Sequence, residues 1–416
     1  MTAFSNFIAE ELKKRDEHSL LRSRRAFEYV SSTELVYNGN HYRNYSSNDY
    51  LGLASSFCLT EFNKWQDTRL GITGNNCSSG SMASPLVTGF SYQHKALIDD
   101  LLNYVDAPDD YSAVLFSSGY AANNGVINAL FKDKDKDNSS QLFQDKLNHA
   151  SLIDAGTKLQ AAGHLTQKRF NHNNVEHLTK LLNTKSGPLQ KRLLATEGVF
   201  SMDGDRAPLI EISKIARQTN TLLMVDDAHG FGISSHSLHT SGITLSDVDI
   251  YVVTFGKSLG AQGAAVIAKN DICQYLENFC KDYIYSTHLS PLQCAAVQFN
   301  LHKLNDADRQ QKLQQNIKLF KNLAAKYGLP VLDSDTAIQP IVVGDEEHAL
   351  KMTEQLKQHG IWLTAIRTPT VAKGKSRLRV TITSDHKSND ISGLVDCLVK
   401  VFSLPKTSTG EVGHSD

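Results

Sequence analysis

Between residues 112 and 268 the chain passes repeatedly from a short, continuous apolar run to a longer stretch with helical periodicity. Such runs predict strands buried on both faces, and strands that alternate with helices predict parallel pairing. One intervening stretch, Pro208–Gln218, has isoleucines at 210, 212 and 215 that are expected on one side of an amphipathic helix. We therefore predict an α/β fold with a mostly parallel central sheet covered by helices. The expected strands are Ser112–Phe116, Arg192–Thr196, Leu222–Val225, Ile250–Thr254 and Ala264–Ala268.

The chain beyond residue 290 is expected to form a second, smaller α/β domain. It is helical in pattern to about residue 327, and then carries strand patterns near 338–343, 361–366 and 377–383 and helix patterns at 346–359 and 389–402. At the other end, residues 1–30 are expected to be helical, and Asn38-Gly39 predicts a hairpin turn. The expected organisation is an N-terminal helix and hairpin (1–50), a large domain (51–290), a small C-terminal domain (291–405) and a disordered tail (406–416).

The charge balance argues against two classes of partner. The 416 residues include 43 Lys and Arg against 44 Asp and Glu, which gives a net charge of −1. Nucleic acids and acidic membranes attract basic surfaces, so neither is expected as a main partner. No apolar run reaches the roughly 18 residues of a membrane span, and the N-terminal stretch carries no apolar signal core. We expect a cytoplasmic protein.

Cysteines and histidines indicate neither disulfides nor a metal site. The six cysteines are scattered and form no C-x-x-C pair, so reduced, structural thiols are expected. His172 and His177 lie in a polar stretch that is typical of a solvated turn, and no H-E-x-x-H motif occurs. No metal is expected.

Two strand ends carry the residues that most suggest chemistry. Asp226 and His229 follow one expected strand, and Lys257 follows the next. In open parallel sheets ligands bind at the carboxyl ends of the strands, so these three side chains can converge on one cleft. Each of them alone is also compatible with a plain cap or turn, and it is the combination that indicates a site.

A lysine with a nearby carboxylate is typical of pyridoxal phosphate chemistry. The lysine forms a Schiff base with a carbonyl group, and the carboxylate keeps the pyridine nitrogen protonated. A phosphate binds backbone N–H groups at a helix N-terminus, which Ser117-Ser118-Gly119-Tyr120 predicts. Tyr120 and His149 offer flat side chains beside the ring. A P-loop is excluded, because its first glycine would fall on Tyr251.

A series of longer motifs connects these residues to a known family. The chain resembles the α-oxoamine synthases, pyridoxal phosphate enzymes of the fold-type I aminotransferase class, from about residue 5 to residue 403. The resemblance implies a large cofactor-binding domain and a smaller C-terminal α/β domain. Its motifs are SSNDYLGLA (46–54), GSMASPLVTG (80–89), FSSGYAANNGVI (116–127), DKLNHASLIDA (145–155), TEGVFSMDGDRAPL (196–209), MVDDAHGFG (224–232), TFGKSLGAQGA (254–264) and TAIRTPTVAKGKSRLRVT (364–381).

The resemblance implies a role for individual residues of this sequence. Lys257 would hold the cofactor covalently, Asp226 would pair with the pyridinium nitrogen, His229 would bond the ring hydroxyl, and His149 would stack on the ring. The positions matched to binding of the cofactor and its phosphate are Gly119, Tyr120, Ser201 and Thr254; those matched to the substrate carboxylate are Asn48 and Arg379; those matched to the acyl substrate are Arg22 and Thr370.

The same resemblance implies the reaction and the partners. Within the family the chain is most similar to members that join L-alanine to a pimeloyl thioester, with coenzyme A or acyl carrier protein as carrier, and release CO2. It implies a homodimer in which the segment Tyr285-Ser286-Thr287 reaches the neighbouring subunit's cofactor phosphate. Two alternatives stay open: a sibling synthase that uses glycine or another acyl thioester, and a non-catalytic partner subunit of the same fold. Lys257 argues against the second alternative.

Some positions depart from the family pattern. Met82 and Pro85 stand where the family often has a small residue and an arginine, and Thr368 and Ala372 replace common prolines. The stretch 132–141 looks like an insertion. These departures bear on the acyl substrate rather than on the cofactor. On the strand expected near 377–383, Arg377 and Arg379 share a face, and Arg377 is expected to be solvated.

Overall fold

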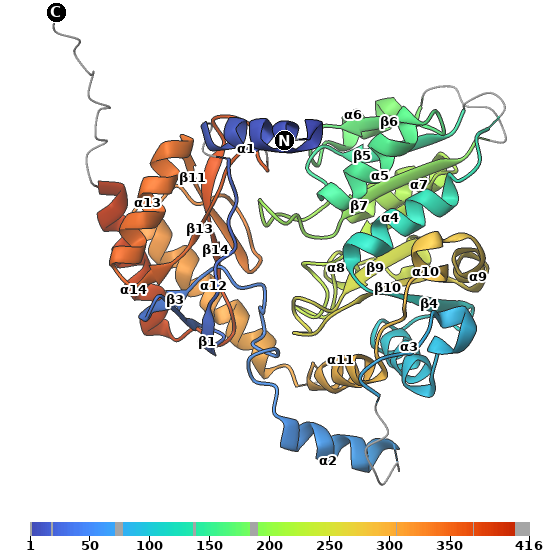
Figure 1. Ribbon diagram of the computed structural model, residues 1–416, viewed down its shortest axis with the longest axis horizontal. Helices are drawn as coiled ribbons and strands as arrows, with labels where there is room; N and C mark the ends of the chain where they lie inside the picture. The colour runs from blue at the N-terminus through green and yellow to red at the C-terminus, as the bar shows by residue number, and fades with distance from the viewer. Residues whose placement is uncertain are drawn as a thin grey trace, which may run out of the picture.

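The computed structural model describes residues 2–17, 20–70, 78–135, 139–183, 190–304, 306–368 and 370–403. Two bodies lie side by side: a large one around a seven-stranded sheet, and a small one around a three-stranded sheet (Figure 1). We refer to them as the large and small domains, and we retain residues 51–290 and 291–405 as their proposed limits. The expected disordered tail, 406–416, lies outside the described residues.

The central sheet is mostly parallel, as predicted. Its order is β4-β10-β9-β8-β7-β5-β6, and only β10 runs antiparallel to its neighbours. The five expected strands are present with ends within one residue of those predicted, whereas β5 and β6 were not anticipated. The strands are β4 (Tyr111–Phe116), β5 (Gln141–Asp145), β6 (Thr166–Phe170), β7 (Arg192–Glu197), β8 (Leu222–Asp226), β9 (Ile250–Thr254) and β10 (Ala264–Lys269).

Both faces of this sheet are buried, which explains why its central strands are apolar throughout. Val252 packs into one hydrophobic cluster and its neighbour Val253 into the other, on opposite faces. The helices that contribute to the two clusters are α3 (Tyr92–Tyr104), α6 (Val175–Leu182), α7 (Leu209–Gln218) and α11 (Pro291–Lys303) on one side, and α4 (Gly119–Leu130), α5 (Ala150–Ala161) and α9 (Asn270–Phe279) on the other.

The expected face of α7 was only partly right. Ile212 is buried, but Ile210 is 39% exposed because it lies about 200° around the helix from Ile212. Shorter or peripheral helical segments complete the large domain: α2 (Leu59–Leu70), the π-helix η1 (Pro85–Gly89), α8 (Ser237–Thr240), the 3-10 helix η2 (Leu245–Asp247) and α10 (Lys281–Ile284).

The small domain is built from both ends of the chain. Its three-stranded antiparallel sheet has the order β11-β14-β13, and a second sheet, β1-β2-β3-β12, joins the N-terminal hairpin to a strand that comes more than 300 residues later. Asn38 and Gly39 have φ of 52° and 75°, which confirms the predicted turn. The elements are β1 (Glu28–Ser31), β2 (Glu34–Tyr37), β3 (Asn40–Asn44), α12 (Asp308–Lys326), β11 (Ile338–Gly344), α13 (Glu346–Gln358), β12 (Ile361–Trp362), β13 (Thr364–Ile366), β14 (Ser376–Thr381) and α14 (Ser388–Ser403).

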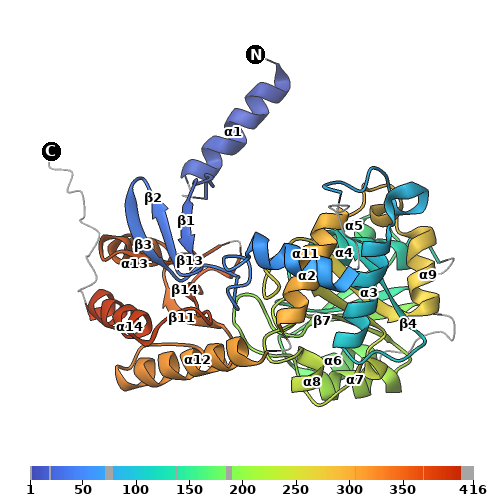
Figure 2. The ribbon, with the colours of Figure 1, turned by 90° about the horizontal axis from the view of Figure 1, so that it is seen from below.

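The N-terminal helix is shorter than expected. α1 spans Ala3–Glu17 and projects from the body of the molecule (Figure 2), with no buried residue. The chain has no regular structure at 20–27 and enters β1 at residue 28, so the predicted helix over 1–30 was wrong in its second half. Within the described ranges, no helix is long and apolar enough to cross a membrane.

Candidate active site

A cavity of about 290 Å³ lies where β7, β8 and β9 end, at the carboxyl edge of the central sheet. The last residues of parallel strands lie at the same edge of the sheet, and the loops that follow these strands surround the cavity. Eight of the expected site residues line it: Asn48, His149, Asp226, His229, Thr254 and Lys257, with Gly119 and Tyr120 at the start of α4.

Asp226 is a fixed carboxylate at the bottom of this cavity. It is the last residue of β8 and is 4% exposed. One carboxylate oxygen accepts a hydrogen bond from Asn123 Nδ2 at 2.6 Å, and the other accepts from the backbone N–H of Ala228 at 3.0 Å. Asn123, which also donates to Ser151 Oγ at 2.9 Å, was not anticipated from the sequence. The carboxylate therefore has a defined orientation and is suited to hold a cation or a protonated ring nitrogen.

Lys257 lies in the turn after β9 and presents its amine to the same cavity. Its Nζ donates to Thr254 Oγ1 at 3.4 Å and forms no ion pair within the described residues. Burial lowers the pKa of Lys257, and the nearby Asp226 and Glu197 oppose this effect only in part. A lowered pKa increases the share of neutral amine, which is the form that attacks a carbonyl group.

Two neutral imidazoles flank the lysine. His149 caps α5: its Nδ1 accepts the backbone N–H of Ser151 at 3.2 Å, and burial lowers the pKa of this histidine. His229 Nδ1 hydrogen-bonds the Tyr50 hydroxyl at 2.6 Å. Burial, followed by the positive charges of Lys257 and Arg379, lowers the pKa of His229 well below its ordinary value. Both rings are thus uncharged hydrogen-bonding groups at neutral pH.

The N-terminus of α4 offers an anion-binding edge. Ser118 caps the helix by accepting the Ala121 N–H at 3.1 Å, so the first turn begins at Gly119 on the cavity wall. A Cβ at Gly119 would lie 2.5 Å from Thr254 Cγ2, which leaves room only for glycine beside β9. Free N–H groups at a helix start suit a phosphate. Tyr120, 45% exposed, adjoins this edge and donates to Asp154 at 3.2 Å.

Arg379 approaches the cavity from the small domain. It lies on β14, and its Nη2 donates to Asn48 Oδ1 at 3.2 Å. Its Nε is buried and has no partner among the described residues. A guanidinium with an unused donor suits a carboxylate, which it can bind with two parallel hydrogen bonds. Asn48 also accepts from the Tyr50 hydroxyl at 3.2 Å, which connects this pair to His229.

Besides Arg379, three expected site residues do not line the cavity. Ser201 is buried, and its backbone N–H bonds the carboxylate of Glu197 rather than facing the space. Arg22 and Thr370 are exposed and lie outside the lining residues. Their expected roles remain predictions.

Glu197 is a site residue that the sequence interpretation missed. It ends β7, lines the cavity, is 2% exposed, and accepts the backbone N–H of His149 at 2.5 Å. Burial, and after it the charge of Asp226, raises the pKa of Glu197 well above its ordinary value. An acid that ends a continuous apolar strand is the signal that singled out Asp226, and it was equally present here.

Ser258 is a competing nucleophile that geometry removes. The segment Gly256–Gly260 has the G-x-S-x-G spacing of a nucleophile elbow. Ser258 is 1% exposed, however, and its hydroxyl donates to the carbonyl of Phe231. It is a packing residue, whereas Lys257 of the same turn lines the cavity.

Two other expectations need correction. His172 is not in a solvated turn: its Nδ1 lies 3.0 Å from Asp145 and its Nε2 lies 2.7 Å from Asp205. Although burial opposes protonation, the hydrogen bonds to Asp145 and Asp205 raise the pKa of His172 to about 10. Arg377 is not solvated either. It is 7% exposed and pairs with Asp203 of the large domain, because β14 turns this face toward that domain.

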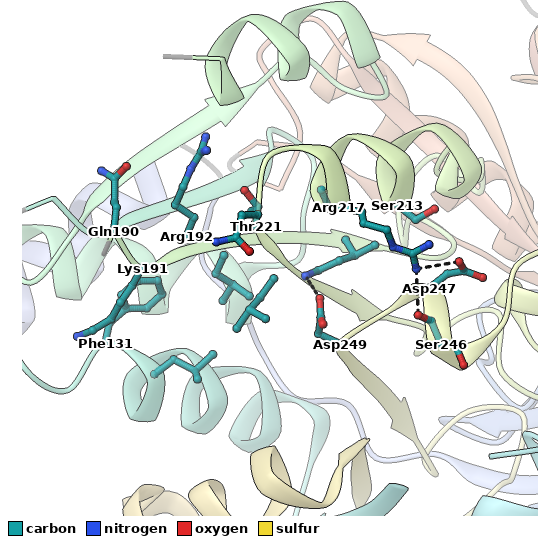
Figure 3. A pocket seen from close by; sticks show the side chains of 16 residues that line it. Phe131, Gln190, Lys191, Arg192, Ser213, Arg217, Thr221, Ser246, Asp247 and Asp249 are labelled. Carbon is teal, nitrogen blue, oxygen red and sulfur yellow. Dashed lines mark hydrogen bonds and ion pairs between the residues drawn. The ribbon is translucent and has the colours of Figure 1, made fainter. Parts of the chain in front are cut away.

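A second cavity, of about 440 Å³, lies at the opposite edge of the sheet, where β7 and β8 begin (Figure 3). Its charged groups already have partners in the chain. Arg217 donates to Asp247 and to the carbonyl of Ser246, both at 3.1 Å, and Asp249 accepts the Leu223 N–H at 2.7 Å. This larger space contains no comparable cluster of available acids and bases.

Comparisons with known proteins show the family to which the chain belongs. The family model for aminotransferase class I and II matches residues 42–398. The chain is 40% identical over 402 residues to 8-amino-7-oxononanoate synthase of Aliivibrio fischeri, with 95% of this chain and 98% of the relative covered. The solved 8-amino-7-oxononanoate synthase of Francisella tularensis is 25% identical, with a TM-score of 0.69 and coverage of 86% and 97%. A serine palmitoyltransferase variant solved with pyridoxal phosphate is 26% identical, with a TM-score of 0.82 and coverage of 96% and 98%.

Proposed function

The chain belongs to the aminotransferase class I and II family, in its 8-amino-7-oxononanoate synthase branch, and from this premise we propose its reaction. The enzyme joins L-alanine to a pimeloyl thioester and forms 8-amino-7-oxononanoate, CO2 and the free thiol, a step of biotin biosynthesis. The thiol is coenzyme A or acyl carrier protein. The observation that carries the proposal is that Lys257, Asp226 and Asn48 line one cavity, and that Arg379 of the small domain donates a hydrogen bond to Asn48.

The residues fit pyridoxal phosphate as the cofactor. Lys257 provides the amine for its aldehyde, Asp226 the carboxylate for its ring nitrogen, and the N-terminus of α4 the N–H groups for its phosphate. His149 and His229 are uncharged donors or acceptors for the ring face and the ring oxygen. The bound cofactor supplies an electron-withdrawing ring that stabilises negative charge at the α-carbon of alanine.

The chain's own residues handle the substrate and the proton. Arg379 binds the alanine carboxylate through its unused Nε, and Nη2 of the same guanidinium donates to Asn48 Oδ1. Nζ of Lys257 is the base for the α-proton, since burial lowers the pKa of this amine toward neutrality. Arg22 and Thr370 are proposed contacts of the acyl substrate.

We also propose a cytoplasmic homodimer. α1 carries Phe4, Phe7, Ile8 and Leu12, each at least half exposed, and Tyr285, which begins the segment proposed to reach the partner's phosphate site, is 78% exposed. Apolar surface of this kind is typical of an interface between copies. Sedimentation at assay concentration tests it: a fully active monomer would rule out a shared site.

Product identification tests the reaction. Purified enzyme is incubated with L-alanine and pimeloyl-CoA, and the products are analysed by mass spectrometry, with glycine and shorter or longer acyl thioesters in parallel. We expect 8-amino-7-oxononanoate from the first pair. A product formed only from glycine, or only from another thioester, would favour the sibling synthases instead.

A further inference from the structure

A buried ion pair joins the two domains beside the site. Arg377 of β14 is 7% exposed, its Nη1 pairs with Asp203 Oδ1, and its Nε donates to the carbonyl of Lys375 at 3.2 Å. Asp203 belongs to the loop that follows β7, in the large domain. No ligand role is available to Arg377, because its charge is already matched.

This loop, Gly198–Arg206, is attached to both domains. It begins directly after Glu197, which lines the cavity, and contains Ser201, which bonds Glu197. Besides its contacts within the large domain, such as that of Asp205 with His172, the loop reaches the small domain: the carbonyl of Gly204 accepts from Ser334 Oγ at 2.9 Å and Thr336 Oγ1 at 2.8 Å. A Cβ at Gly204 would lie 2.3 Å from the carbonyl oxygen of Ile338, so the backbones of these two segments are in direct contact.

Arg377 and Arg379 sit on the same face of β14. In a strand, residues two apart point the same way, and Leu378 between them is buried in the core of the small domain. Arg377 is therefore anchored to the large domain about 7 Å along the strand from Arg379. Because Arg377 is held against the loop Gly198–Arg206, the position of Arg379 relative to the large domain is also fixed.

We propose that Asp203 and Arg377 are a positioning pair for Arg379, and so for the carboxylate of the amino-acid substrate. This inference rests on the proposed function, in which Arg379 binds that carboxylate. The pair holds β14 against the loop that starts at Glu197, so that the carboxylate site in the small domain and the cofactor site in the large domain keep their spacing. Neither member touches the reacting atoms.

The test is a double-mutant cycle on the holoenzyme with Asp203→Asn, Arg377→Gln and the double variant. We expect KM for L-alanine to rise about tenfold in each single variant, with kcat and the KM for pimeloyl-CoA changed less than about threefold, because the damage is to placement rather than to chemistry. The double variant should be no worse than either single one. Arg377→Lys, which keeps the charge, should recover part of the loss.

The matched control breaks a second ion pair between the same loop and the small domain. Arg206 Nε lies 2.9 Å from Asp335, whose side chain is 66% exposed. Asp335→Asn should leave KM for L-alanine within about twofold, since exposed pairs contribute little. Circular dichroism and thermal unfolding of every variant show whether it folds.

The amino-acid affinity is also measured without turnover, by titrating the absorbance of the bound cofactor with L-alanine, glycine and L-serine. If wild type binds another amino acid, the proposed substrate fails, but the pair still predicts weaker binding of that amino acid in Asp203→Asn. Folded variants that bind and convert the amino acid as wild type does would overturn the positioning role. Equal losses for all substrates together with a lower unfolding temperature would reduce it to a structural one.

Discussion

The cavities at the two edges of the central sheet differ in what their charged side chains contact. At the edge where β7 and β8 begin, Arg217 pairs with Asp247, Lys191 pairs with Asp135, and the buried Arg192 donates to the carbonyls of Thr219 and Leu182. At the carboxyl edge, neither Lys257 nor Arg379 forms an ion pair within the described ranges, although both line or border a buried space. A buried charge without a partner is unfavourable unless a ligand completes it. This contrast favours the smaller cavity as the proposed active site, whereas volume alone would have selected the other.

The largest difference between the two cavities is expected when the amine of Lys257 is removed. Lys257→Ala should lose about 10³-fold or more of turnover, because the covalent anchor and the base for the α-proton disappear together. Lys191→Ala, in the other cavity, should keep the wild-type rate. Borohydride reduction followed by peptide mapping should attach the cofactor to Lys257, and a label on a different lysine would refute the assignment.

The next test separates two neighbouring acids. Asp226→Asn should retain cofactor and fold but lose about 100-fold or more in kcat, because a neutral amide cannot hold a protonated ring nitrogen. Asp227 points beneath the site, where it accepts the Ser237 N–H at 2.8 Å and the Tyr251 hydroxyl. Because Asp227 does not line the cavity, Asp227→Asn should be milder. Steady-state rates of the two variants at equal cofactor occupancy decide the point.

A third test compares an arginine from each edge of the sheet by its effect on kcat/KM for L-alanine. Arg379→Lys should lower kcat/KM for L-alanine by about 30- to 150-fold, the equivalent of about 2–3 kcal/mol, because an ammonium cannot make two parallel hydrogen bonds. Arg217→Lys at the opposite edge serves as the control and should change it by less than about twofold. Equal small effects would mean that the carboxylate is bound elsewhere, with Asn48 the next residue to examine.

A substitution at His172 tests whether a partly buried charge near the carboxyl edge stabilises the fold rather than taking part in the reaction. Its pKa is raised to about 10 in the folded protein, so its contribution is complete below the unfolded value of about 6.5 and disappears as pH rises toward 10. The difference in free energy of unfolding between wild type and His172→Asn should shrink by at most about 1.4 kcal/mol per pH unit over that window. Urea unfolding at several pH values measures it, and a difference that grows with pH would contradict the charge assignment.

The smallest effect is expected at the opposite edge. Asp249→Asn should change kcat/KM by less than about twofold, because its carboxylate contacts the Leu223 backbone and no reacting group. Burial raises the pKa of Asp249, so loss of its charge is tolerated. A large loss of activity in a folded variant would show that this cavity takes part in the reaction.

Local patterns in the sequence predicted the elements that have one clear physical cause. The five apolar strands were found because both faces of the central sheet are buried. β5 and β6 were missed because QLFQD and TQKRF mix polar and apolar residues nearer the edge of the sheet. Nothing in the Ala264–Lys269 run distinguishes an antiparallel strand from a parallel one, so the direction of β10 could not be read from it.

In the site, too, the residues that a local pattern marks were predicted, and those that depend on tertiary structure were not. Asp226 and Lys257 were found because each follows a strand whose position was clear. Asn123 was missed because it lies inside α4, where an asparagine has many ordinary uses. Arg377 was taken as solvated because its partner, Asp203, is 174 residues away in the chain and only the tertiary structure brings the two together. Long-range pairing is the part that a single sequence does not encode locally.

The pairing of β3 with β12 has a consequence for synthesis. Ser46 and Thr364, which hydrogen-bond beside this pairing, are separated by 318 residues. At 5–20 residues per second the ribosome needs about 15–60 s to make that interval. We expect the N-terminal hairpin to wait without its strand partner while the large domain folds first, and protease digestion of stalled nascent chains would detect this order. A nascent chain halted after the seven-stranded sheet would thus contain the strand ends of the cofactor pocket but lack Arg379, the proposed ligand of the amino acid, so the last third of translation would turn a cofactor-binding protein into an enzyme.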